Sequence, residues 1–60
     1  MPRSADEILR ILLAKADAGE VAPKQAGTLR HLAQRIADGK PMSEMQEELV
    51  RDFGVAYGVE

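Results

Sequence analysis

The 60-residue chain has no cysteine and no tryptophan, and it has a single histidine, His31. Without cysteine, a disulfide framework and a thiolate metal site are excluded. One histidine cannot build a multi-histidine metal site. No apolar run approaches the roughly 20 residues that cross a membrane, and the N-terminus lacks the pattern of a signal peptide. We therefore expect a small cytoplasmic domain with no membrane segment, no metal and no cofactor.

Helix start and stop signals organise the first two thirds of the chain. Ser4 and Glu7 have the spacing of a capping box, in which each side chain bonds the other residue's backbone N–H. Gly19 then supplies a left-handed stop. Pro23 suits the first turn of a second helix, and Gly39 ends that helix. The two segments between these signals carry apolar residues at helical spacing.

A second capping box, formed by Ser43 and Gln46, predicts a third helix. We expect it to end at Phe53 because Gly54 follows, and we expect residues 54–60 to form a loosely structured tail. The sequence thus predicts an all-α fold, a single small three-helix domain over residues 1–60 with short loops. Its helices are predicted at about 5–18, 23–38 and 43–53.

The first predicted helix is unusually apolar around its circumference. Its apolar residues cover an arc of roughly 200°, against roughly 140° for each of the other two helices. We therefore expect it to be the central element, covered on two sides. The second cover is either another helix of the same chain or a second copy, with Leu13 or Ile11 at the edge of the seam. A homodimer would add burial without adding residues to a short chain.

One side of the third predicted helix is also apolar, and it includes two methionines. We interpret this side as core, rather than as an adaptable groove for a partner helix, because two methionines are few for such a groove. The residues concerned are Met42, Met45, Leu49, Val50 and Phe53.

The net charge of −2 conceals a division along the chain: residues 1–23 carry −1, residues 24–41 carry +3 and residues 42–60 carry −4. Within the second helix, the basic side chains have no acidic residue three or four positions before them. They are either solvated or paired with the acidic third helix, or they contact an acidic protein, or they contact phosphate. We select as partner-binding candidates Lys24, Arg30, His31 and Arg35.

Binding of nucleic acid is the alternative function. Residues 29–39 resemble the first helix and glycine turn of a helix-turn-helix unit. The following helix would then read the bases, but its first turns carry Glu44, Glu47 and Glu48, which phosphates would repel. A nucleic-acid binder would therefore have to use the second helix itself.

The sequence offers no constellation for catalysis. Ser4 and Ser43 are engaged as helix caps, and Thr28 with His31 is a neighbouring pair on one exposed face without a third partner. The glycines match neither a P-loop nor a dinucleotide fingerprint. We therefore predict a non-enzymatic module that binds another protein, as a regulator or inhibitor. Tyr57 on the tail is a further candidate anchor for that partner. The frequent Ala, Arg, Gly and Val are typical of a high-GC genome and favour a bacterial or phage origin.

Overall fold

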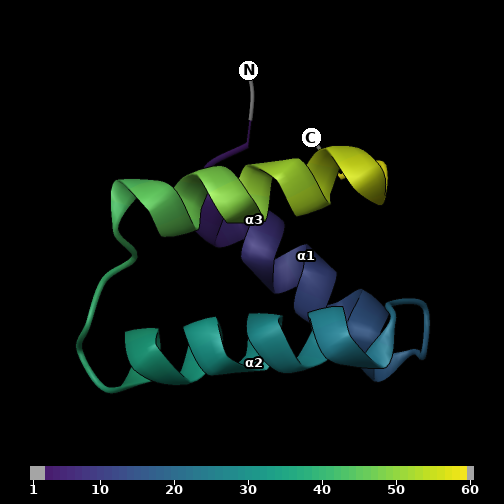
Figure 1. Cartoon of the computed structure of the whole chain (residues 1–60), viewed down its shortest axis with the longest axis horizontal. Coiled ribbons are helices and arrows are strands. Elements are labelled where there is room, and N and C mark those ends of the chain that lie inside the picture. The colour runs from purple at the N-terminus through teal and green to yellow at the C-terminus, as the bar shows by residue number, and fades with distance from the viewer. Residues whose placement is uncertain (1–2, 60) are drawn as a thin grey trace.

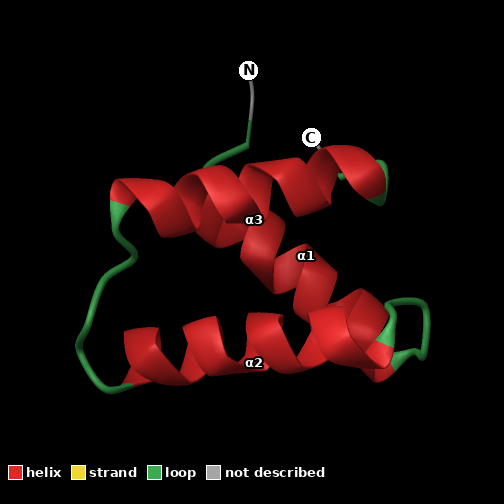
Figure 2. Ribbon diagram, viewed as in Figure 1, coloured by secondary structure: helices red, strands yellow, loops and turns green. Residues whose placement is uncertain are grey.

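The computed structural model describes residues 3–59, and within that range the chain consists of three helices and their loops, with no strand (Figures 1 and 2). Helix α1 spans Ala5–Asp17, α2 spans Pro23–Ala37 and α3 spans Glu44–Ala56. The predicted all-α three-helix fold is confirmed. The two loops are short, so each helix is followed by one that turns back across the molecule.

The two predicted capping boxes differ in the structure. At α3 both halves form: Ser43 Oγ accepts from the Gln46 N–H at 3.3 Å, and Gln46 Oε1 accepts from the Ser43 N–H at 3.0 Å. At α1 only the serine half forms, with Ser4 Oγ accepting from the Glu7 N–H at 3.2 Å. The Glu7 carboxylate instead lies 3.6 Å from Nε of Arg3. Both serines still satisfy a backbone donor that the first turn leaves unpaired.

All three helices end at a glycine in the left-handed region, with φ of 78° at Gly19, 84° at Gly39 and 73° at Gly58. The predicted stops at Gly19 and Gly39 are confirmed. The predicted end of the third helix at Phe53 is wrong, because α3 passes through Gly54 and continues to Ala56. The left-handed glycine that ends the third helix is therefore Gly58 and not Gly54.

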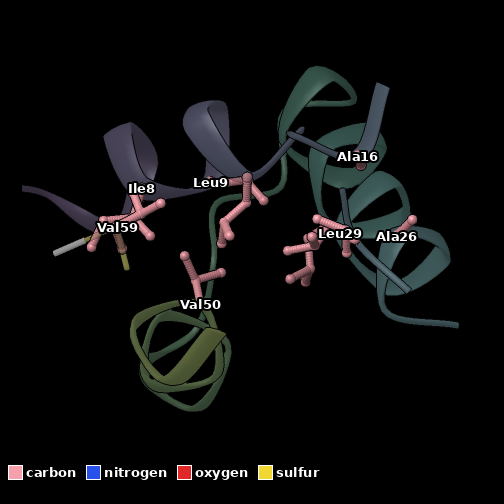
Figure 3. Close-up of a cluster of buried hydrophobic side chains, with 11 residues drawn as sticks. Ile8, Leu9, Ala16, Ala26, Leu29, Val50 and Val59 are labelled. Carbon is pink, nitrogen blue, oxygen red and sulfur yellow. The ribbon is translucent and has the colours of Figure 1, made fainter. Parts of the chain in front are cut away.

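Gly54 is instead the place where three segments meet. A Cβ built on it would lie 2.8 Å from Cγ2 of Ile8 and still closer to the backbone oxygen of Val59. The Val59 N–H donates to the Gly54 carbonyl at 2.6 Å, and the Val59 side chain is buried beside Ile8 (Figure 3). Residues 54–59 therefore form a helix end and a closing turn, not the loose tail that we predicted, and residue 60 lies outside the described residues.

Helix α1 is the central element, as its wide apolar arc predicts. It packs against both α2 and α3, whereas α2 and α3 touch each other little (Figure 1). Each helix contributes one fully buried side chain to the core: Leu12, Leu29 and Val50. Val50 points from α3 into the space between Leu9 and Leu29 (Figure 3). The core thus lies along α1, and the outer ends of α2 and α3 extend beyond it.

Candidate interaction surfaces

The first candidate surface is an apolar stripe on α3 that the core leaves uncovered. Met45 is 81% exposed and Leu49 is 39% exposed, which contradicts our prediction that both belong to the core. Val50, Phe53 and Met42 do lie in the core or against it. Residues three and four apart are neighbours on a helix surface. We call Met45 and Leu49, which are both exposed and one turn apart, the α3 stripe.

Acidic side chains border the α3 stripe. Glu48 follows Met45 by three positions, and Asp52 follows Leu49 by three, so each lies beside an apolar member of the stripe. Both carboxylate residues are exposed. The surface is therefore an apolar ridge with a negative margin.

The second candidate surface is the basic face of α2. Arg30 is not free, because its Nη2 lies 3.5 Å from Oδ1 of Asp17, the last residue of α1. Within residues 3–59, no hydrogen bond or ion pair engages the side-chain charge of Lys24, His31 or Arg35. These three follow one another at helical spacing, and we call them the α2 row.

Arg35 differs from the other two members of the α2 row because one of its side-chain nitrogens is buried. Its Nε is buried from solvent and has no hydrogen-bond partner within the described chain. A buried donor without a partner is costly. No ion pair joins α2 to the acidic α3 among residues 3–59, so the pairing of these two helices that we considered is not formed there.

Tyr57 is not on a tail but caps the C-terminal end of α3. Its hydroxyl donates to Oε1 of Gln25 and accepts from the Ala22 N–H at 3.4 Å. The half-buried ring packs against the core. The hydroxyl that we selected as the polar tip of a partner anchor thus joins the end of α3 to the start of α2.

The third candidate surface is a pocket between α1 and α2, with a volume of about 260 Å³. Its apolar part combines buried, half-buried and exposed side chains, and Ile36 is 37% exposed. Two charged residues stand at its rim. The residues that line the pocket are Asp6, Leu9, Arg10, Leu13, Ala33 and Ile36.

The structure separates the two residues that we predicted for self-association. Ile11 and Leu13 are both half-buried against the core. They are two positions apart, which turns them about 200° from each other around the helix axis. Leu13 lines the pocket and Ile11 does not. The structure therefore places the two alternatives on different sides of α1.

Two further features complete the description. Within residues 3–59 there is no group of three or more histidine and acidic side chains placed to hold a metal ion. Of the three helices that the structure describes, none has both the length and the apolar character to cross a membrane.

Comparison with known protein families, curated protein sequences and solved structures finds no match to this chain. Inference about its function therefore starts from its own surfaces: the α3 stripe, the α2 row and the pocket between α1 and α2.

Proposed function

We propose that this protein is a non-enzymatic module that binds a larger protein, as a regulator or inhibitor, with the α3 stripe as its contact surface. The observation that carries the proposal is the exposure of Met45 and Leu49, 81% and 39%, one turn apart on the same helix. A single apolar side chain on a surface is ordinary. Two that adjoin form a ridge, which suits the groove of a partner that receives one face of a helix.

The chemistry of the ridge supports this proposal. The flexible thioether of Met45 adapts to irregular apolar surfaces. Full burial of one such side chain contributes about 1.5–3 kcal/mol to binding. Because Glu48 and Asp52 border the ridge, the complementary groove is apolar with lysine or arginine at its edge. The composition adds the expectation that the partner is a cytoplasmic protein in a bacterial or phage system.

Affinity capture from an extract of the source cells tests the proposal with a matched pair of variants. Met45→Lys/Leu49→Lys replaces the ridge by charge, and we expect it to lose a protein that the unaltered chain retains. Val55→Lys is the control, because Val55 is 62% exposed on the same helix but outside the ridge. Equal capture by the double variant would contradict the α3 stripe as the contact surface, provided that circular dichroism shows all three proteins folded.

Binding of nucleic acid is the second candidate function, and the α2 row is the observation that favours it. Lys24, His31 and Arg35 lie on one helix face with no acidic partner within residues 3–59. Phosphate contacts of this kind weaken steeply as salt rises. Fluorescence anisotropy with a generic DNA duplex and a single-stranded RNA, beginning at about 50 mM salt, measures this directly. Absence of binding at that salt concentration excludes the second candidate.

A further inference from the structure

We propose that the pocket between α1 and α2 is the interface of a two-fold symmetric homodimer, in which Asp6 of each copy pairs with Arg10 of the other. This inference does not rest on the proposed function, because the pocket does not include the α3 stripe. Its occupant is a second copy of this chain.

The lining favours a protein surface over a small molecule. The pocket volume of about 260 Å³ is below the roughly 300–1,000 Å³ of small-molecule sites. The exposed part of its lining is the edge of an apolar seam: Leu13 is half-buried and Ile36 is 37% exposed. Such an edge is covered well by a second apolar edge of the same kind.

The charges at the rim identify that second edge. Asp6 and Arg10 are one turn apart on α1, in the order that favours an ion pair, yet neither forms one within residues 3–59. Both side chains are exposed at the rim. The pocket thus offers one acid and one base that have no ion-pair partner among the described residues, around an apolar floor.

A surface that carries one positive and one negative charge is complementary to the same surface on a second copy of the chain. In a two-fold interface the same patch serves both subunits, so that residue i meets residue j and residue j meets residue i. An axis that passes midway between Asp6 and Arg10, near the level of Leu9, sets the two α1 helices antiparallel. Each Asp6 then faces an Arg10, with Leu9 of each copy close to the axis and Leu13 opposite the residues that precede Asp6 in the other copy. The α2 row and the margin of the α3 stripe each carry a single sign, which suits a different molecule.

The wide apolar arc of α1 gives the independent reason for a second cover. Its buried residues already face α2 and α3, and Leu13 extends the apolar surface into the pocket. A standard interface covers about 800 Å² on each partner, which is about a fifth of the 4198 Å² accessible surface of this chain. For a chain of 60 residues, burial of that size is a large addition to a small core.

Charge reversal in pairs tests the interface by sedimentation at micromolar to millimolar concentrations. Asp6→Arg places two cations at each rim, and Arg10→Asp places two anions there, so each variant alone should dimerise about tenfold more weakly. A mixture of the two variants should form a heterodimer as tight as the unaltered homodimer, because every cation then faces an anion. Asp52→Arg and Lys24→Asp make the same changes in net charge elsewhere on the surface, and they should leave the dimer unchanged.

A measurement on the unaltered protein tests the same interface even if a charge-reversal variant fails to fold. In methyl NMR spectra recorded from low to high concentration, the shifts of Leu9, Leu13 and Ile36 should move together, while that of Val55 stays constant. A single species near 6.6 kDa at every concentration would overturn the dimer. Dimerisation without heterodimer recovery in the mixture, or shifts confined to Met45 and Leu49, would overturn this interface. In that last case the α3 stripe would hold the second copy.

Discussion

Helix α1 packs on two neighbours, and the two seams are completed differently. At the α1–α3 seam, Gly54 lets the backbone of α3 lie against Ile8, and Val59 folds back to close the end. At the α1–α2 seam, the helices lie together near their short connection, where Ala16 and Ala26 are buried (Figure 3). Further along, the same two helices leave the pocket between them.

The difference shows how a short chain distributes a small core. Helices that cross at an angle touch closely over a limited length, and residues beyond that length need another cover. The C-terminal turn supplies this cover at the α1–α3 seam, since Val59 lies on Ile8. No such segment covers the pocket within residues 3–59, and we assign that role to a second copy.

The test with the largest expected loss of stability shortens one α1 side chain at each seam. Ile8→Ala removes a buried side chain from the α1–α3 seam and should cost about 3 kcal/mol. Such a loss is comparable to the whole stability of a domain of this size, so most of the helical circular dichroism signal should disappear at 25 °C. Leu13→Ala acts at the pocket, where the side chain is already half-exposed, and should cost about 1 kcal/mol.

At a concentration where sedimentation shows only monomer, urea denaturation measures the loss in Leu13→Ala, and the helical circular dichroism signal that remains at 25 °C measures the loss in Ile8→Ala. Equal losses would mean that the two seams are equally closed, and the comparison would fail.

The second test is Gly54→Ala, which adds one methyl group to the closed seam. The new Cβ has no room between the Val59 oxygen and Ile8, so the closing turn must move and Val59 must lose part of its burial. We expect a net loss of about 2 kcal/mol, because overpacking outweighs the higher helix propensity of alanine. In a chain truncated after Tyr57, the obstructing oxygen is gone and the same substitution should cost much less. An unchanged cost in the truncated chain would assign the loss to something other than the closing turn.

These two tests also mark how far the sequence predicts the fold. Caps, stops and apolar periodicity are local, so the three helices and the stops at Gly19 and Gly39 follow from the residues themselves. A glycine in a helix pattern has two meanings, a stop or a close approach, and nothing local distinguishes them at Gly54. The available signal was the apolar spacing from Val50 to Tyr57, seven positions on, which continues the buried side of α3 past Gly54.

The candidate surfaces were less predictable for a physical reason. Periodicity identifies which side of a helix is apolar, but it does not show how much of that side a neighbouring helix covers. Leu49 and Val50 are neighbours in α3 but point about 100° apart around its axis, so Val50 is buried while Leu49 and Met45 are exposed. The pocket likewise depends on the crossing of α1 and α2, which no local pattern encodes.

The third test concerns the hydroxyl of Tyr57, which joins the end of α3 to the start of α2. Tyr57→Phe removes its hydrogen bonds to Gln25 and Ala22 and keeps the ring in place, so we expect a loss of about 1 kcal/mol. Gln25→Ala removes the same side-chain bond from the other side. The double variant should cost less than the two single losses added together, as a double-mutant cycle in urea measures. Strict additivity would show that the hydroxyl and the amide act independently.

The smallest test is Gly27→Ala, the counterpart of Gly54→Ala in α2. Gly27 is exposed within the helix, and apart from its chain neighbours and the adjacent backbone of α2 no heavy atom lies within 4 Å of the position that a Cβ would take. The substitution should therefore stabilise the protein by about 1 kcal/mol through helix propensity alone and raise the melting temperature by about 4–8 °C. A melting temperature that falls would contradict the open surroundings of Gly27. Two glycines inside helices thus predict opposite signs for one chemical change, because only Gly54 has another backbone against it.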